Sequence, residues 1–246
     1  MSHEDIFWEL HAGLARQAPG SAATTTELLG FCQPLPEPIR ALDIAAGPGP
    51  ASLVLASQAG AHVTAVDTHR PFLEQLETRA AQRGLQSSIR TLVAPMEALP
   101  FDDGSFELVW CEAAAYLMGV DAALDSWQRL LAPGGALVIT DCEWRTAEPS
   151  DQARAFWQAY PGMRSGDANR RAIAEAGYEL LGYVELPESD WWDEYYTPLS
   201  ERIDALEQGD DPDAAELAPM LREEILLRRD HGDDYGYTGY AMRAAS

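Results

Sequence analysis

Apolar residues along the chain gather into short runs, and amphipathic stretches separate these runs. A short apolar run that ends in a turn is typical of a buried strand, whereas apolar residues three and four apart are typical of a helix. Strands are expected over residues 39–44, 62–66, 88–93, 106–111, 136–140, 178–186 and 235–243. Helices are expected over residues 3–18, 24–31, 50–59, 71–83, 121–131, 166–176, 198–208 and 213–229.

The expected elements alternate between strand and helix over most of the chain. Repeated strand–helix–strand units favour an α/β fold, in which helices cover both faces of a mainly parallel sheet. A chain of 246 residues suits one domain, so we expect a single domain over residues 1–246. Residues 1–38 are expected to form an N-terminal helical cap, and residues 187–232 a helical insertion that is a lid or an interface.

Acidic residues dominate the charge pattern. The chain has 40 Asp and Glu against 17 basic residues, all of them Arg, and its net charge is −23. Such a surface repels phosphate backbones and anionic lipids, so neither nucleic acid nor a membrane is expected as a partner. No apolar run reaches about 18 residues, and the acids close to Met1 argue against a secretory signal.

The residues best able to bind metals or to form disulfides are scattered. Cys32, Cys111 and Cys142 have no metal-ligand spacing, and the five histidines show no paired ligand spacing. An odd and low cysteine count is typical of a reducing compartment. We therefore expect a cytoplasmic protein with free thiols and without a metal site.

A glycine-rich turn follows the first expected strand. Gly47-Pro48-Gly49 comes after a strand that contains an acid near its end, Asp43, and a helix follows the turn. Glycines let the backbone approach a ligand, and the start of the helix presents free N–H groups. Asp67 follows the second strand, where an acid can accept both hydroxyls of a ribose. Alternatively, Asp67 caps the helix that begins near Pro71.

Two classes of nucleotide-binding protein share these features. Enzymes that bind NAD use Gly-x-Gly-x-x-Gly, but Ser52 stands in place of the third glycine. Asp43 before the turn is also foreign to the NAD pattern, and it favours a cationic ligand. S-adenosylmethionine (SAM) is such a ligand, because it has a sulfonium and an ammonium charge.

Several segments between residues 39 and 141 match one family pattern in order and spacing. They are residues 41–49, 63–67, 96–101, 105–110 and 130–139. Together they resemble the motifs of class I SAM-dependent methyltransferases, in the small-molecule branch related to quinone and sterol methyltransferases. Residues 16–20, 110–116 and 157–160 are also similar to an uncharacterised bacterial and archaeal subgroup. The resemblance implies a Rossmann-like sheet of seven strands with the last strand antiparallel, SAM as cofactor and S-adenosylhomocysteine (SAH) as product.

The resemblance also implies roles for individual residues. Asp67 would hold the ribose, and Met96 would pack on the adenine. Gly47 and Gly49 would face the methionine part of SAM, and Cys111 would flank the transferred methyl group. The full set expected to bind the cofactor is Arg16, Gln17, Asp43, Ala45, Gly47, Gly49, Asp67, Thr68, Met96, Glu97 and Cys111.

Two positions depart from the family pattern. Ala45 stands where the family usually has glycine, which narrows the space beside the methionine part of SAM. Pro95 stands where the family usually has an acid that binds the adenine amino group. Glu97 or the backbone around Met96 is expected to take over that contact.

Glu112 and Tyr116 are the expected catalytic residues. Because the sulfonium is already activated, the protein mainly aligns the acceptor with the methyl carbon, and an acceptor proton is removed where needed. Glu112 is the candidate base, and the alternative is an acid that only accepts N–H groups.

Aromatic residues gather where the acceptor side is expected. They are Tyr116, Trp144, Trp157, Tyr160, Trp191, Trp192, Tyr195 and Tyr196. Their faces suit an apolar or aromatic acceptor, or an amine through cation–π contacts, and the alternative is packing between lid and sheet. The expected function is methyl transfer from SAM to a small-molecule acceptor. A non-catalytic SAM-binding sensor or assembly protein, an NAD-dependent oxidoreductase and a homodimer through the apolar helix faces remain alternatives.

Overall fold

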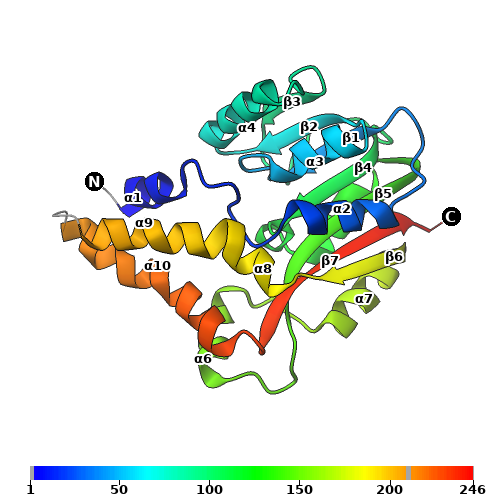
Figure 1. The fold of residues 1–246 in the computed structure, drawn as a ribbon. Helices are drawn as coiled ribbons and strands as arrows, with labels where there is room; N and C mark the ends of the chain where they lie inside the picture. The colour runs from blue at the N-terminus through cyan, green and yellow to red at the C-terminus, as the bar shows by residue number, and fades with distance from the viewer. Residues whose placement is uncertain (1–2, 209–211, 246) are drawn as a thin grey trace.

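The computed structural model describes residues 3–208 and 212–245, which form a sheet of seven strands with helices around it (Figure 1). The strand order across the sheet is β3-β2-β1-β4-β5-β7-β6. The strands are β1 (Arg40–Ile44), β2 (His62–Asp67), β3 (Ile89–Val93), β4 (Phe106–Glu112), β5 (Leu131–Trp144), β6 (Tyr178–Glu185) and β7 (Tyr235–Ala244). Only β7 runs against its neighbours, so the expected sheet with an antiparallel last strand is confirmed.

The central strands bring their carboxyl ends to one edge of the sheet. Asp43 of β1 lies in register with Ala65 of β2 and with Trp110 of β4. Crossovers between parallel strands place the loops that follow them at this same edge, which is where ligands bind in such sheets. The candidate residues that end these strands are therefore neighbours in space although they lie far apart in sequence.

Alternate residues of the central strands point to opposite faces of the sheet, as the two-residue period of a strand requires. Leu42 packs with Trp127 of α5 (Val120–Gln128) on one face, and Ala41 packs with Leu55 of α3 (Pro50–Gln58) on the other. Both faces are buried, which explains the nearly continuous apolar runs of these strands. The other helices on the sheet are α2 (Ala22–Phe31), α4 (Arg70–Gln82) and α7 (Gly166–Glu175).

A helical insertion precedes the last strand and projects from the sheet (Figure 1). It consists of α8 (Glu188–Trp191), a π-helical turn η3 (Trp192–Tyr196), α9 (Thr197–Glu207) and α10 (Pro212–His231). The N-terminal helix α1 (His3–His11) lies against it, because Ile6 and Leu10 pack with Leu217 of α10. The insertion thus forms an apolar cluster with the start of the chain.

Three sequence-based boundaries are wrong. The first helix ends at His11 instead of residue 18, since Gly13 adopts a left-handed φ of 76°. Helix α5 ends at Gln128, and β5 already begins at Leu131. The turn residues Pro133-Gly134-Gly135 lie inside this strand, beside an irregularity in its pairing with β4, and do not separate two elements. The short elements η1 (Ala115–Leu117), α6 (Asp151–Phe156) and η2 (Trp157–Ala159) were not expected.

Candidate functional site

The glycine loop, residues 45–49, joins β1 to α3 in left-handed backbone conformations. Ala45 has a φ of 54°, Gly47 of 54° and Gly49 of 78°. A Cβ atom on Gly49 would stand 2.1 Å from Cδ1 of Leu76, so only glycine fits between the loop and α4. Ala45 adopts a conformation that suits glycine, at a cost of about 1 kcal/mol.

Asp43 is buried beneath the glycine loop. Its Oδ2 accepts a hydrogen bond from the Ser52 hydroxyl at 2.6 Å. Burial raises the pKa of the Asp43 carboxyl to about 7, although the Ser52 hydrogen bond opposes this shift. Ser52, which replaces the third glycine of the NAD pattern, is therefore a partner of the acid.

The Asp67 side chain binds a backbone N–H group of the glycine loop. One carboxylate oxygen accepts the Gly47 N–H at 2.8 Å, and the other accepts the His69 N–H at 2.8 Å. His69 is the residue immediately before α4, so this contact fixes the entrance to the helix and is not a cap on its first turn. Ribose binding and helix capping both require Asp67 at the end of β2. Its side chain lies there, between the glycine loop and the start of α4.

The residues after β2 and β3 lie next to each other. The Ala94 N–H donates to the Asp67 carbonyl at 3.3 Å, which ties the two strand ends together. Met96 is half-buried against the central core, and its carbonyl accepts the Trp127 indole N–H at 3.3 Å. Thr68 and Glu97 are exposed at the same edge.

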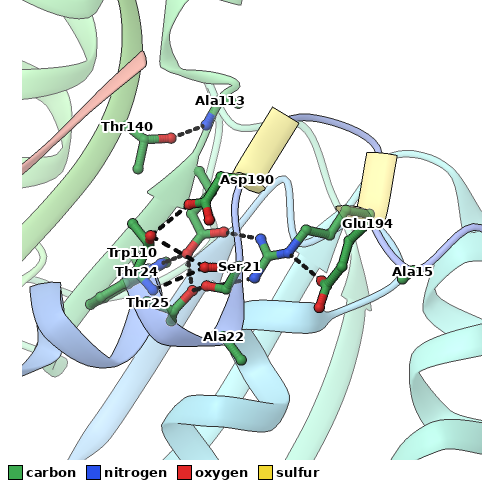
Figure 2. Close-up of polar contacts among 12 residues, drawn as sticks. Ala15, Ser21, Ala22, Thr24, Thr25, Trp110, Ala113, Thr140, Asp190 and Glu194 are labelled. Atoms are coloured by element: carbon green, nitrogen blue, oxygen red, sulfur yellow. Dashed lines mark hydrogen bonds and ion pairs between the residues drawn. The ribbon is translucent and has the colours of Figure 1, made fainter. Parts of the chain in front are cut away.

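The N-terminal segment, residues 12–21, crosses over the glycine loop and is held by Arg16. The Arg16 guanidinium is 3% exposed and pairs with Glu112 at 2.7 Å and with Glu194 at 3.1 Å. Burial works to lower its pKa, but the two ion pairs outweigh this and raise it. Figure 2 shows this cluster, with Glu194 on one side and Thr25 and Asp190 on the other.

Glu112, the expected base, has donors on both carboxylate oxygens. Oε2 accepts from Arg16, and Oε1 accepts the Thr25 hydroxyl at 2.8 Å and the Trp110 indole N–H at 2.9 Å. These contacts match the alternative interpretation, an acid that accepts N–H groups. In this arrangement Glu112 anchors the N-terminal segment to the end of β4.

Two further side chains fix the N-terminal segment to the glycine loop. Arg79 of α4 donates to the Leu14 carbonyl at 2.8 Å and to the Ala15 and Pro48 carbonyls at 3.1 Å. Gln17 lies over Gly47, with its Cγ 3.7 Å from the point where a Cβ on that glycine would stand. The sequence analysis missed Arg79 and Glu194, because no local pattern links them to a segment more than 60 residues away.

Two cavities adjoin at this edge of the sheet. The loop cavity has a volume of about 50 Å³, and its lining includes Asp43, Glu112, Arg16 and the glycine loop. The aromatic cavity has a volume of about 280 Å³, and both cavities share Ala18 and Pro19 of the N-terminal segment as a wall. The complete lining of the aromatic cavity is Ala18, Pro19, Ala113, Tyr116, Cys142, Phe156, Trp157, Ala159, Tyr160, Tyr195, Glu224 and Tyr237.

The structure separates the expected aromatic residues into two groups. Four of them line the aromatic cavity, namely Tyr116, Trp157, Tyr160 and Tyr195. The others pack between insertion and sheet, with Trp191 and Tyr196 fully buried. Phe156, Tyr237 and Glu224 also line the cavity, and the sequence analysis missed them because they come from three separate elements.

Cys111, which was expected beside the transferred methyl group, lies away from both cavities. Its side chain is fully buried in the central core cluster and lines neither cavity. Burial raises the pKa of the thiol, so Cys111 is a packed, neutral side chain in this structure.

A left-handed residue follows Glu112, at the end of β4. Ala113 has a φ of 55°, and its N–H donates to the Thr140 hydroxyl at 2.8 Å (Figure 2). Ala113 and Ala45 are the two residues other than glycine with positive φ in the described part of the chain. They end neighbouring strands, one beside each cavity, and backbone strain of this kind concentrates at functional sites.

Within residues 3–208 and 212–245, no group of three His, Cys, Asp or Glu side chains is arranged to hold a metal ion. Over the same residues, no helix combines the length and the apolar composition that crossing a membrane requires.

Comparison with known proteins finds similarity over the segment that contains the glycine loop and Asp67. A family model described as a methyltransferase domain matches residues 42–139. A demethylmenaquinone methyltransferase of Thermus thermophilus is 39% identical over 106 residues, which are 42% of this chain and 47% of that protein. A malonyl-[acyl-carrier protein] O-methyltransferase of Pseudescherichia vulneris is 33% identical over 153 residues, 62% of this chain and 54% of that protein. The chain thus spans about half the length of these curated relatives.

Solved structures share the fold over nearly the whole chain. A SAM-dependent methyltransferase from Geobacter sulfurreducens, crystallised with SAH, superposes with a TM-score of 0.85 at 21% identity over 98% of both chains. The [4+2]-cyclase SpnF superposes with a TM-score of 0.76 at 18% identity over 96% of this chain and 91% of that chain. The fold therefore hosts more than one reaction.

Residues 42–139 therefore match a methyltransferase domain, and the chain has the fold of a solved SAM-dependent methyltransferase. The two named relatives are methyltransferases that act on demethylmenaquinone and on malonyl-[acyl-carrier protein]. The residues present fit SAM, since Asp43 and Glu112 line the loop cavity and Asp67 stands beside it, which suits a ligand with positive charges.

Proposed function

We propose that the protein transfers a methyl group from SAM to a small molecule held in the aromatic cavity. The observation that supports this most is that Ala18 and Pro19 line both the carboxylate-lined cavity and the aromatic one, so the two cavities adjoin. A donor and an acceptor in adjoining sites gain much of their reactivity from alignment alone. An aromatic or an amine group suits the aromatic walls.

The cofactor would lie along the ends of β1, β2 and β3. Asp67 would exchange its contact with the loop for the ribose hydroxyls, and the N–H groups of the glycine loop would face the methionine part. Thr68, Met96 and Glu97 stand at the strand ends where the adenine would lie. Pro95 is exposed there and has no N–H group, so the neighbouring backbone and Glu97 are left for the adenine amino group.

SAM supplies a methyl group on a sulfonium, which an acceptor atom displaces. The protein would position the acceptor with Tyr116, whose ring centre lies 5.2 Å from that of Tyr160 in the cavity wall. Glu112 would hold Arg16 and thereby the N-terminal segment, because its two carboxylate oxygens already accept hydrogen bonds from Arg16, Thr25 and Trp110.

The N-terminal segment and the insertion would form a cover over the cofactor. The loop cavity of about 50 Å³ is far smaller than the 300–1,000 Å³ of typical ligand sites, so the cover would move when SAM enters. Arg16 joins the moving segment to Glu112 of the sheet and to Glu194 of the insertion. The ion pairs would close again over the bound cofactor.

Two broader expectations also remain proposals. A cytoplasmic location is supported by three buried free thiols, which do not form disulfides with one another. A homodimer is supported only by exposed apolar side chains such as Met220 and Leu226 on α10.

A non-catalytic SAM-binding protein is the second candidate. The observation in its favour is that Glu112 is not a free base in this structure. NAD-dependent chemistry is less well supported, because Ser52 fills the place of the third glycine and bonds to Asp43.

Isothermal titration with SAM, SAH and NAD tests the cofactor, and transfer of labelled methyl groups to a panel of amines, phenols, thiols and acids tests the reaction. We expect Asp67→Ala to weaken SAM binding about 100-fold, because each hydrogen bond to a charged group contributes about 1.5–3 kcal/mol. Asp103→Ala, at an exposed surface ion pair, should leave affinity unchanged. No binding of SAM or SAH at millimolar concentrations would overturn the proposal, and binding without transfer would favour the second candidate.

A further inference from the structure

The aromatic cavity has a charge pattern of its own. Its wall consists of aromatic and small side chains, and Glu224 is the one charged residue in the lining. No arginine or histidine of the described residues lines it. A cavity with this composition offers nothing to balance an anionic ligand, whereas it offers a carboxylate and several π faces to a cation.

Glu224 extends into this cavity from α10 without a cationic partner. Its Oε1 accepts the Tyr196 hydroxyl at 2.6 Å, and no salt bridge to Glu224 forms within the described residues. Burial raises the pKa of the Glu224 carboxyl, and the Tyr196 hydrogen bond opposes the shift. Glu224 is half-buried and has no cationic partner among residues 3–208 and 212–245, so a cation bound in the cavity would form an ion pair with it.

The rings around Glu224 come from four parts of the chain and enclose the cavity. Tyr116 and Tyr160 lie 5.2 Å apart between ring centres, and Trp157 lies in the same wall. Tyr195 and Tyr237 complete the wall from the insertion and the last strand. Quaternary and other substituted ammonium groups are recognised by such aromatic enclosures within about 6 Å of the ring centres.

We propose that the methyl acceptor is an amine whose positive charge lies between Glu224 and the aromatic wall. This inference rests on the proposed function and names the acceptor of the same site. The amine binds in its ammonium form and first releases one proton to solvent. Its nitrogen then forms the new N–C bond with the freed lone pair, while the C–S bond breaks and its electron pair stays on sulfur. Positive charge therefore moves from sulfur to nitrogen, toward the carboxylate and the rings, where it is stabilised as it develops.

The test compares a cation with its neutral isostere, so that shape is held constant. Choline and 3,3-dimethylbutan-1-ol differ in that a carbon replaces the charged nitrogen. We expect choline to bind at least tenfold more tightly than the neutral alcohol. Calorimetry on the 246-residue chain measures both affinities, with and without SAH. Equal binding, or tighter binding of the neutral alcohol, would overturn the inference in favour of a neutral acceptor.

A matched pair of variants assigns the preference to Glu224. Glu224→Gln should remove most of the tenfold preference for choline and leave binding of the neutral alcohol unchanged. Glu223→Gln, on the exposed side of the same helix, should retain the preference. A preference that persists in folded Glu224→Gln would contradict the assignment; should that variant not fold, the comparison of the two ligands in the natural protein still decides.

The two proposals fail in different ways. Choline preference without methyl transfer to any amine would remove the proposed function and leave the cation site. Transfer of methyl groups to a phenol or an acid, with no preference for choline, would leave the proposed function and remove the amine.

Discussion

The loop cavity and the aromatic cavity share a wall, but their linings come from very different distances along the chain. The loop cavity is lined mainly by residues 43–51, with residues 16–19 of the N-terminal segment and Glu112 at the end of β4. The aromatic cavity is lined by residues from the N-terminal segment, the turn after β4, β5, the helices after β5, the insertion and β7. One cavity is thus largely a local structure, and the other exists only because distant segments meet.

The same comparison holds for one acid in each cavity, the buried Asp43 and the half-buried Glu224. Asp43 accepts one hydrogen bond from Ser52, nine residues away, and Glu224 accepts one from Tyr196, 28 residues away. In both cases burial raises the carboxyl pKa and the hydroxyl opposes the shift. Each cavity therefore presents one carboxyl group that has no cationic partner among the described residues, which suits a positively charged ligand in each.

Replacing Gly49 gives the largest expected effect and tests whether the loop cavity is a rigid local structure. Gly49→Ala places a Cβ 2.1 Å from Leu76 at a φ of 78°. Overpacking and left-handed strain together should lower the free energy of unfolding by about 3 kcal/mol, as measured by urea denaturation. Gly60→Ala is the control, because Gly60 has a φ of 62° but open space around it. It should cost only about 1 kcal/mol, and equal losses would mean that Leu76 moves freely.

The wall between the cavities is tested by double-mutant cycles at Arg16. The pair Arg16→Gln and Glu112→Gln removes a nearly buried ion pair, and we expect a coupling energy of about 2 kcal/mol. The pair Arg16→Gln and Glu194→Gln involves a carboxylate that is 44% exposed, so its coupling should stay below about 1 kcal/mol. Thermal or urea unfolding of the single and double variants provides both values. A larger coupling energy with Glu194 than with Glu112 would show that Arg16 is held by the insertion and not by the sheet.

The smallest expected effect is a pH dependence of SAM affinity, which tests whether the Asp43 carboxyl in the loop cavity attracts a positive charge. The pKa of Asp43 is raised to about 7, so its carboxyl is mostly protonated at pH 6 and mostly ionised at pH 8. An ionised Asp43 attracts the sulfonium, so SAM affinity should rise with pH over this window, by up to about tenfold or 1.4 kcal/mol. SAH lacks the sulfonium charge and should show a shallower dependence in the same titrations. Asp43→Asn should flatten the difference, and an equal slope for SAM and SAH would exclude Asp43 as the cause.

Much of the fold and of the loop cavity could be predicted because both depend on local patterns. The apolar runs of the central strands, the glycine loop and the position of Asp67 at a strand end each lie within a few residues. The helix expected over residues 3–18 was predicted too long, since Gly13 and the contacts of Arg16 favour an irregular segment over a helix. Glu112 was placed at the right strand end, but its partners Arg16 and Thr25 could not be inferred from its position.

By itself the sequence determined the order of strands and helices, the class of cofactor loop and the strand ends at which the site lies. These follow from the spacing of apolar residues and from the few residues that allow a tight turn. Only the tertiary structure decided that Arg16 covers the loop, that Cys111 lies in the core and that Glu224 faces the aromatic cavity. The physical reason is distance along the chain: a side chain on α10 meets Tyr116 only after the sheet, the insertion and the N-terminal segment have packed together.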